Sequence, residues 1–294
     1  SEARHFEFGD VDEAFKKCDR VREDTFYLHP VSHAFLEPTN SVASWDLNGR
    51  LTIWTSTQTP YFIQTLLAMV LGIKEGNIRV IKPHVGGGFG GKMELFSDQY
   101  CAARLSMLTG KPVKIELDRE EVFIATRRRH PMYYTLKTGY MKDGTLVAKE
   151  AKVYTDGGAY NAMGPTSLYL SGFFQIFPYT IPNYRYDGFH IYTNKNPSSA
   201  MRGFGGPQAE FTCDSQIDMI ADDLGMDPAE IRLKNGMKPG HVIPGLAKVG
   251  SCGFEECVKK AMESTKWKEK KGKLPMGRGI GMGCYGFMSG GVFN

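Results

Sequence analysis

Two glycine-rich loops constrain the fold of this 294-residue chain more than any other feature. The first runs from Val85 to Lys92 and the second from Ala200 to Gln208, and both contain a Gly-Phe-Gly-Gly core. Glycine lets the main chain adopt positive φ and approach a ligand closely, so bare N–H groups can bind an anionic or oxygen-rich cofactor. A core that occurs twice in one chain calls for one shared explanation, which a single tight turn does not provide.

The first loop also matches two nucleotide-binding patterns. Its glycines fit the G-x-G-x-x-G dinucleotide fingerprint after a strand-like run at 78–81, and residues 86–92 nearly fit a P-loop. A P-loop requires a serine or threonine after the lysine to hold Mg²⁺, whereas position 93 is methionine. A dinucleotide site requires an acidic residue about 20 residues beyond the glycines, and the acids here come slightly later. A nucleotide-binding protein that uses loop 86–92 remains the alternative hypothesis.

Hydrophobic periodicity predicts helices and strands in irregular succession. Apolar spacing and end signals predict helices at 10–18, 60–71, 95–108, 207–224 and 228–233. Alternation and turn signals predict strands at 51–55, 78–81, 113–117, 133–140, 145–154 and 188–193. Because no regular βαβ alternation appears, the pattern predicts an α+β fold of mixed sheets with packed helices. The length suits one large domain or two subdomains, at about 1–125 and 126–294.

Composition excludes several classes of protein. The apolar runs are too short and too interrupted to span a membrane, and the N-terminus has no signal-peptide pattern. Six scattered cysteines without a C-x-x-C pair indicate a reduced, cytoplasmic protein with no iron–sulfur cluster of its own. The net charge is only +4, and the basic run at 127–130 lacks interleaved aromatic residues, so we expect a solvated or ion-paired face for most of its arginines and no nucleic-acid binding.

Two acidic positions are interpreted as structural. His33 and Glu37 stand four apart, but Pro38 favours an extended backbone there, so hydrogen-bonded roles are expected rather than metal ligation. Asp156 precedes two glycines and is interpreted as a turn residue rather than a base.

Several further segments, spread along the chain, have a characteristic order and spacing relative to the two loops. They include Thr57-Gln58, Arg129-His130-Pro131-Met132, Asp156-Gly157-Gly158-Ala159-Tyr160, Pro182-Asn183-Tyr184-Arg185 and Arg232-Leu233-Lys234-Asn235. In order and spacing, the chain from about Gly9 to Gly290 resembles the molybdenum-binding subunit of the xanthine dehydrogenase / aldehyde oxidase family. It is most similar to the 4-hydroxybenzoyl-CoA reductase and nicotinate dehydrogenase branches.

The resemblance implies a molybdenum-dependent, hydroxylase-type oxidoreductase, of which this chain is the first half of the molybdopterin-binding region. The family's N-terminal hammerhead domain and C-terminal half, with its general-base glutamate, are expected to lie outside this chain, which should be inactive alone. The implied cofactor is molybdopterin cytosine dinucleotide, with molybdenum held by the pterin dithiolene and by no protein ligand. [2Fe-2S] clusters and FAD are expected on iron–sulfur and flavin subunits that form a hetero-oligomer with it.

The resemblance also assigns roles to residues of both loops. Main-chain N–H groups of the first loop would bind an oxygen on the metal, and Gln58 would offer it a donor and an acceptor. Arg202 would bind an anionic pterin or a transition state that gains negative charge, so Gln58 and Arg202 are the expected catalytic residues. The expected cofactor-binding set is Gln58, Gly88, Phe89, Gly90, Ala200, Arg202 and Gly203.

Departures from the family pattern concern the substrate. In the purine-oxidising branch a glutamate follows the lysine of the first loop and an arginine precedes the second loop. By spacing, these positions are Met93 and Leu170 here, the latter next to Tyr169. Phe204 would stack on or wedge an aromatic substrate. The pocket of Met93, Tyr169, Leu170 and Phe204 therefore predicts an aromatic, heteroaromatic or aldehyde substrate held by apolar contacts, and not xanthine.

Overall fold

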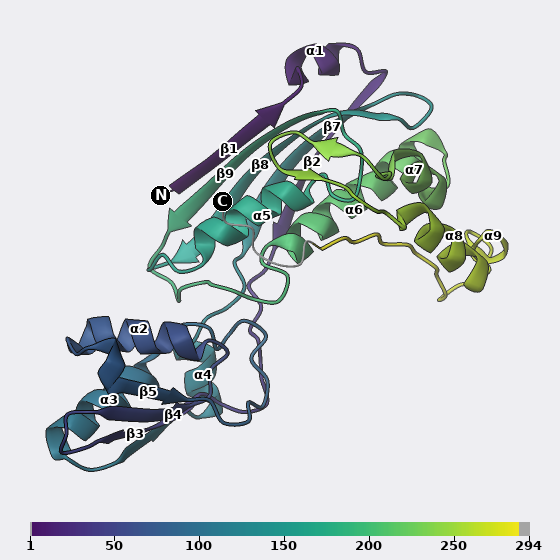
Figure 1. Cartoon of the computed structure of the whole chain (residues 1–294). Helices are drawn as coiled ribbons and strands as arrows, with labels where there is room; N and C mark the ends of the chain where they lie inside the picture. Colours follow the sequence, from purple (N-terminus) through teal and green to yellow (C-terminus); the bar gives the residue numbers. More distant parts are fainter. Residues whose placement is uncertain (1, 288–294) are drawn as a thin grey trace.

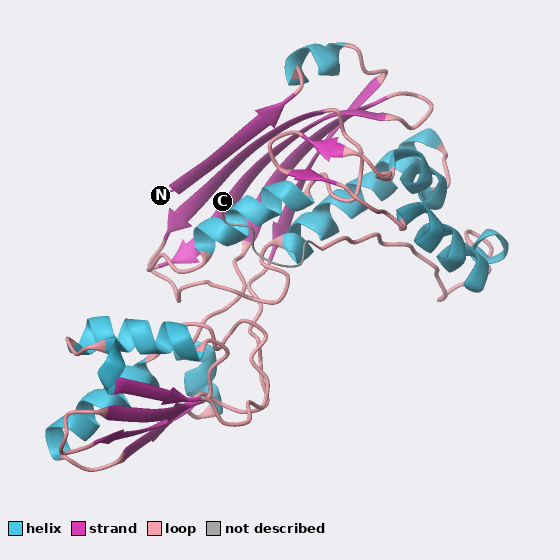
Figure 2. Ribbon diagram, viewed as in Figure 1, coloured by secondary structure: helices cyan, strands magenta, loops and turns pink. Residues whose placement is uncertain are grey.

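A computed structural model describes residues 2–287, which form two lobes connected by loops (Figures 1 and 2). Each lobe has its own sheet, its own covering helices and its own buried core. Both sheets combine antiparallel strand pairs with one parallel pair. This is the α+β architecture of mixed sheets that the sequence predicts.

The larger lobe contains a five-stranded sheet in the order β1-β9-β8-β7-β2. Its strands are β1 (Glu2–Phe8), β2 (Arg20–Leu28), β7 (Met132–Tyr140), β8 (Leu146–Gly158) and β9 (Asn183–Tyr192). Helices α5 (Gly164–Phe174) and α6 (Gly206–Leu224) cover one face of this sheet (Figure 1), and the short helix α1 (Val11–Lys16) joins β1 to β2. Alternate strand residues such as Tyr134, Leu136 and Tyr186 are fully buried beneath the helices.

The smaller lobe comprises roughly residues 40–125. Its sheet has the order β5-β4-β3-β6, formed by β3 (Asn40–Trp45), β4 (Leu51–Thr55), β5 (Ile78–Ile81) and β6 (Val113–Glu116). Its helices are α2 (Pro60–Leu71), α3 (Ser97–Thr109) and α4 (Arg119–Ala125), with a 3-10 turn at Glu75–Asn77. The buried side chains of Ile53, Ile63 and Leu67 lie at the centre of this second core.

The two lobes do not correspond to the two consecutive subdomains, about 1–125 and 126–294, that the sequence suggests. Strand β2 pairs with β7 along its whole length, from Arg20 opposite Tyr140 to Leu28 opposite Met132, and β1 pairs with β9. A boundary at 125 would therefore separate strands of one sheet. The smaller lobe is instead an insertion between β2 and β7, a relation that depends on long-range pairing and leaves no local sequence signal.

The last described part packs on the end of α6 in the larger lobe. It contains α7 (Pro228–Asn235), the hairpin of β10 (Val242–Ile243) and β11 (Ala247–Lys248), α8 (Phe254–Ser264) and α9 (Trp267–Lys270). Trp267 is buried and donates its indole N–H to Asp227, the N-cap of α7, at 2.9 Å. Residues near Cys284 then return to α6, where the Cys284 N–H donates to Asp214 at 2.7 Å. Among helices of the described part, none combines the length and apolarity needed to cross a bilayer.

Local end signals account for the helices that the sequence predicts. Asp10 caps α1 by accepting the N–H of Glu13 at 3.1 Å, and α2 and α3 end at Gly72 and Gly110. Strands β1, β2 and β3 and helices α4, α5 and α8 escape the sequence analysis. Strands β1 and β2 are rich in charged residues, and the buried positions of α5 include Ser167, Ser171 and Gly172, so these elements lack the expected contrast between apolar and polar positions.

Asp156 lies in a strand and not in a turn, which corrects the interpretation from its glycine neighbours. It belongs to the end of β8, where the pairing with β9 shifts register between Asp156 and Gly158. Its carboxylate accepts the N–H of Gly158 at 3.0 Å, the hydroxyl of Thr193 at 2.6 Å and the ammonium of Lys195 at 2.7 Å. The side chain stabilises an irregular strand end, a structural role as expected.

Candidate cofactor site

The two glycine loops meet where the two lobes join. The first loop follows β5 and the second leads into α6. The carbonyl of Phe89 accepts the N–H of Arg202 at 3.0 Å. Gly90 approaches Ala200 so closely that a Cβ on it would lie 2.8 Å from the Ala200 carbonyl oxygen. The loops therefore contact each other backbone to backbone, which a side chain at position 90 would prevent.

Gln58 lies between β4 and α2 and is bound to the first loop. Its N–H donates to the carbonyl of Lys92 at 2.8 Å, and its Oε1 accepts the N–H groups of Gly90 at 2.9 Å and Lys92 at 3.3 Å. A Cβ on Gly88 would lie 2.5 Å from Oε1, so glycine makes room for this amide. Two backbone donors orient the amide, since its NH₂ group cannot accept them. Gln58 can therefore present only its Nε2 hydrogens to a ligand, which narrows the donor-and-acceptor role expected from sequence.

The phenylalanine of each loop has a left-handed backbone conformation. The φ angles are 53° for Phe89 and 44° for Phe204. A non-glycine residue in this region costs about 1–3 kcal/mol, and such residues gather at functional sites. Within residues 2–287 the N–H of Phe89 has no hydrogen-bond acceptor. That N–H is available to a ligand at the surface of the junction, where 48% of the Phe89 side chain is exposed.

The second loop is fixed through its backbone. Arg129 donates to the carbonyl of Arg202 at 2.8 Å and to Oε1 of Gln208 at 3.1 Å. Nε2 of His33 lies 2.7 Å from the carbonyl oxygen of Ala200, a hydrogen-bonded role of the kind expected for this histidine. The guanidinium of Arg202 is exposed and pairs with no carboxylate in the part of the chain that the structure describes. The loop thus holds the Arg202 backbone and leaves its charged group for a ligand.

The donors at the junction fit an anionic, oxygen-rich cofactor. The Phe89 N–H, the Gln58 Nε2 and the Arg202 guanidinium are all hydrogen-bond donors. The neighbouring glycines have no side chains that would block a ligand from reaching them. Among the described residues, no group of three or more His, Cys, Asp or Glu could hold a metal ion. The structure brings together Gln58, Gly88, Phe89, Gly90, Ala200, Arg202 and Gly203.

The four residues expected to form a substrate pocket are not shown to contact one another, unlike the cofactor-binding set. The carbonyl of Met93 accepts the hydroxyl of Thr59 at 2.7 Å, and Phe204 lies in the second loop. Tyr169 contacts the ring of Phe6 edge-on at 6.2 Å, and Leu170 packs against the core of the larger lobe. Tyr169 and Leu170 thus contact the sheet, and a common pocket of the four residues stays a prediction.

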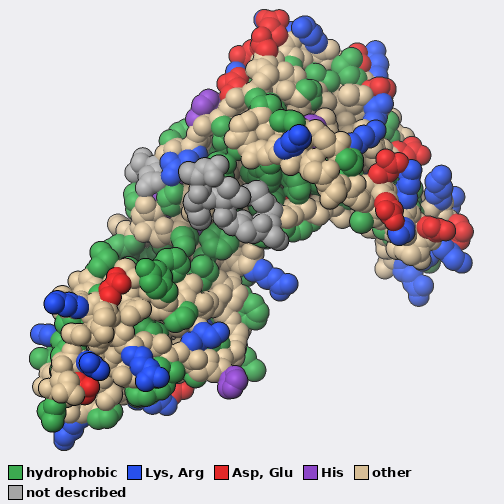
Figure 3. Space-filling model, viewed as in Figure 1, with side chains coloured by type: hydrophobic (Ala, Val, Ile, Leu, Met, Phe, Trp, Pro, Cys, Tyr) green, Lys and Arg blue, Asp and Glu red, His purple; other side chains and the backbone are tan. Residues whose placement is uncertain are grey.

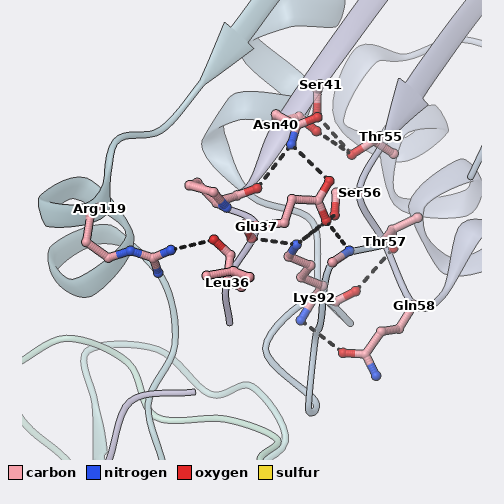
Figure 4. A network of polar contacts seen from close by, with 12 residues as sticks. Leu36, Glu37, Asn40, Ser41, Thr55, Ser56, Thr57, Gln58, Lys92 and Arg119 are labelled. Atoms are coloured by element: carbon pink, nitrogen blue, oxygen red, sulfur yellow. Dashed lines mark hydrogen bonds and ion pairs between the residues drawn. The ribbon is translucent and has the colours of Figure 1, made fainter. Parts of the chain in front are cut away.

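Lys92 is buried and cannot reach a phosphate. Its Nζ donates to the carbonyl oxygen and to Oε2 of Glu37, both at 2.8 Å, and to Oγ of Ser56 at 2.7 Å (Figure 4). Burial lowers the pKa of the Lys92 ammonium, although the ion pair with Glu37 opposes this shift. Burial alone would raise the pKa of Glu37, but the hydrogen bonds from Lys92, Ser56 and the Gly86 N–H outweigh it and bring the pKa to about 2.

This arrangement does not favour the nucleotide-binding alternative. A P-loop lysine must be free to bind phosphate, and both nucleotide motifs place the glycines directly before a helix N-terminus. Here Lys92 is saturated by protein acceptors, and α3 begins only at Ser97.

Glu94 connects the segment after the first loop to Arg127 of the basic run and to Ser199, which precedes the second loop. Glu94 accepts Nε of Arg127 at 2.7 Å and also accepts the hydroxyl of Ser199, just before the second loop. Because both of its oxygens are engaged, Glu94 does not replace the polar substrate anchor absent at Met93. The sequence assigned no role to Glu94 and placed Arg129 only in a basic run and a family-like segment, since their partners are distant in sequence and only the tertiary fold brings them together.

Comparisons with known proteins identify the family of this chain. The molybdopterin cofactor-binding domain family matches residues 1–236. The nicotinate dehydrogenase large molybdopterin subunit of Eubacterium barkeri is 40% identical over 263 residues, covering 89% of this chain and 62% of that subunit. A probable xanthine dehydrogenase subunit of Bacillus subtilis is 39% identical over 239 residues, covering 81% of this chain and 32% of the relative. The chain thus spans about three fifths and one third of these relatives.

Solved structures share the fold. The aldehyde oxidoreductase from Desulfovibrio gigas has a TM-score of 0.88 at 26% identity, over 94% of this chain and 30% of that chain. Quinoline 2-oxidoreductase from Pseudomonas putida has a TM-score of 0.86 at 26% identity, over 91% of this chain and 35% of that chain. The chain therefore belongs to the molybdopterin cofactor-binding domain family, among the molybdenum-binding subunits of the xanthine dehydrogenase family.

Proposed function

We propose that this chain forms the first half of the molybdopterin-binding region of a molybdenum hydroxylase-type oxidoreductase. The observation that carries the proposal is the junction itself, where two glycine loops and Gln58 meet and the Phe89 N–H, the Gln58 amide nitrogen and the Arg202 guanidinium are left as hydrogen-bond donors. The chain spans only part of its relatives, and we propose that the activity belongs to a larger assembly. We expect this chain alone to show no turnover.

Each donor has a role in binding the proposed cofactor, molybdopterin cytosine dinucleotide. The Phe89 N–H and the Gln58 Nε2 would bind oxygens around the metal, with Gly88 and Gly90 keeping the approach open. The exposed Arg202 guanidinium would bind anionic groups or stabilise negative charge that develops during the reaction, with Ala200 and Gly203 supplying the neighbouring loop backbone. When bound, the cofactor supplies an activated oxygen and a two-electron sink. The general-base glutamate would come from the second half of the region.

The substrate we propose is aromatic, heteroaromatic or an aldehyde. Met93 offers only a thioether next to the first loop, and the neighbouring Glu94 is occupied by Arg127 and Ser199. A site without a free polar side chain there selects substrates by apolar contact. Phe204, with Met93 and the α5 residues Tyr169 and Leu170, would supply that contact.

The proposed partners are the second half of the region, an iron–sulfur subunit with [2Fe-2S] clusters and a flavin subunit with FAD. Helix α2 carries exposed apolar side chains that suit burial by another polypeptide, among them Tyr61 (68% exposed) and Met69 (73%) (Figure 3). Both relatives are named as subunits, one of nicotinate dehydrogenase and one of xanthine dehydrogenase, which supports a multi-chain enzyme. All six cysteines are free thiols, which suits the proposed cytoplasmic location.

Metal and nucleotide analysis of the native complex tests this function. We expect molybdenum and a cytosine nucleotide in the wild-type complex, and at least a roughly tenfold loss of both in Gly90→Ala. The reason is that a Cβ at this position, where φ is 92°, meets the Ala200 carbonyl and separates the loops.

The matched control is Gly240→Ala. Gly240 has a similar φ of 85°, but a Cβ on it meets nothing within 4 Å, so this variant should keep its molybdenum. A native complex that contains no molybdenum, or that binds Mg-ATP in a manner dependent on Lys92, would contradict the proposal.

A further inference from the structure

A buried polar cluster lies behind the first glycine loop, and we call it the Lys92 clasp. It consists of Lys92 at the end of the loop, Glu37 from the segment before β3, and Ser56, which directly follows β4 (Figure 4). The Lys92 side chain is wholly buried and that of Glu37 is 27% exposed. Oε2 of Glu37 accepts three donors, the Lys92 ammonium at 2.8 Å, the Ser56 hydroxyl at 2.7 Å and the Gly86 N–H at 2.7 Å.

The clasp connects the two ends of the loop to each other. Gly86, near the start, donates its N–H to the Glu37 carboxylate and accepts the Glu37 N–H at 3.1 Å. Lys92, at the end, donates to the same carboxylate and to the Glu37 carbonyl. Glu37 therefore holds Gly86 and Lys92, the two residues that flank 87–91, close to each other.

The clasp also fixes Gln58 relative to the loop. Ser56, which accepts from the Lys92 ammonium at 2.7 Å, lies on the short stretch that leads from β4 to Gln58. The backbone of Lys92 then bonds to Gln58 twice, accepting its N–H at 2.8 Å and donating to its Oε1 at 3.3 Å. A shift of Lys92 would therefore move the Gln58 amide and the Phe89 N–H together.

The charges of Lys92 and Glu37 allow three side chains to fix both ends of the loop together with Gln58. An ammonium donates three hydrogen bonds and a carboxylate oxygen can accept several, so a neutral pair of similar size cannot reproduce the pattern. Stability alone does not require the charges, because a buried ion pair can often be replaced by neutral residues without loss. Removal of one partner is different, since it leaves the other charge without compensation.

We propose that the Lys92 clasp is a positioning device that places the Phe89 N–H and the Gln58 amide for cofactor capture. Lys92 and Glu37 are positioning residues, because they touch the loop and not the cofactor. This inference rests on the proposed function.

Hydrogen exchange of the backbone amides measures the loop independently of any cofactor. In the purified chain, Lys92→Met should make the hydrogen-bonded amides within residues 86–91, those of Gly86, Gly90 and Gly91, exchange roughly tenfold faster or more, because the base of the loop opens. The matched control is Lys149→Met. Lys149 is a second buried lysine, in the larger lobe, where it donates to the Gln175 carbonyl at 2.8 Å and to Cys213 Sγ at 3.1 Å. That variant should lose stability without faster exchange at 86–91.

A double variant separates positioning from stability. Glu37→Gln with Lys92→Met removes both charges, so its melting temperature should recover relative to Lys92→Met alone. Its molybdenum content in the native complex should nevertheless stay roughly tenfold below wild type, since the neutral pair does not restore the loop.

Three outcomes would overturn the proposal. These are unchanged loop exchange in Lys92→Met, recovery of molybdenum in step with the melting temperature in the double variant, and an equal molybdenum loss in Lys149→Met. A wild-type complex without molybdenum would contradict the proposed function instead, and the exchange experiment would still decide whether the clasp holds the loop.

Discussion

The two glycine loops share a Gly-Phe-Gly-Gly core but are held by different forces. Loop 85–92 is fixed by a buried ion pair, in which the Glu37 carboxylate and the Lys92 ammonium bind both of its ends. Loop 200–208 is fixed through its backbone, by Arg129 on the Arg202 carbonyl and by the close packing of Gly205 on α5. Similar loop conformations are therefore stabilised by an ion pair in one case and by backbone contacts and packing in the other. We expect the stability of the two loops to respond differently to substitution and to pH.

A buried or half-buried carboxyl lies near each loop, and the two are shifted in opposite directions. Hydrogen bonds to Glu37 overcome the effect of burial and bring its pKa to about 2. Glu210, in the first turns of α6, is 6% exposed, and no side-chain hydrogen bond from the described residues reaches its carboxyl group. Burial, reinforced by Asp214, raises the pKa of Glu210 to about 10. The first carboxyl is a charged partner and the second is a neutral acid at pH 7.

The largest effect is expected from Gly205→Ala in the second loop. Position 205 has a φ of 87°, and a Cβ there would overlap the Ser167 carbonyl of α5. We expect a loss of about 3 kcal/mol or more in the free energy of unfolding, measured by urea denaturation. Gly245→Ala, at a φ of 70° with no atom within 4 Å, should cost only about 1–2 kcal/mol. Equal losses would show that packing on α5 does not hold the second loop.

A smaller effect is expected from Arg129→Met, which tests the independence of the loops. The substitution removes the donors to the Arg202 carbonyl and to Gln208, at a cost of about 1–3 kcal/mol. Hydrogen exchange should accelerate at residues 200–208 and stay unchanged at 86–91, where the Lys92 clasp is intact. Faster exchange in both loops would mean that they form one cooperative unit.

The effect of pH on stability should have opposite signs for the two carboxyls. The folded-state pKa of Glu210 lies above its ordinary value of 4.5, so the unfolded chain ionises first and stability falls as pH rises from 4.5 towards 10. Glu210→Gln cannot ionise, so it should melt a few degrees above wild type at pH 8 and match it near pH 4. Thermal melts across this range provide the measurement.

Glu37→Gln is the counterpart with the reverse trend. The folded-state pKa of Glu37 lies below 4.5, so its contribution to stability is present above pH 4.5 and disappears as pH falls towards 2. The variant should therefore melt below wild type at neutral pH and approach it in acid. A shared trend for both variants would remove the distinction between a charged and a neutral carboxyl.

Local sequence was sufficient for much of the secondary structure and for the composition of the loops. Asp10 and Gly72 mark helix ends through contacts with residues only a few positions away, so their effect is visible in the sequence. The charged strands β1 and β2 were missed because they become strands by pairing with β9 and β7, more than a hundred residues along the chain.

The sequence by itself determined that two glycine loops and Gln58 are present and that their order matches one family. Only the tertiary structure decided that Phe89 bonds to Arg202, that Gln58 turns its oxygen to Gly90, and that Lys92 is buried on Glu37. The physical reason is range. Caps and turns are satisfied by neighbours in the chain, whereas a buried charge or an open N–H takes its role from whichever distant residues the fold places beside it.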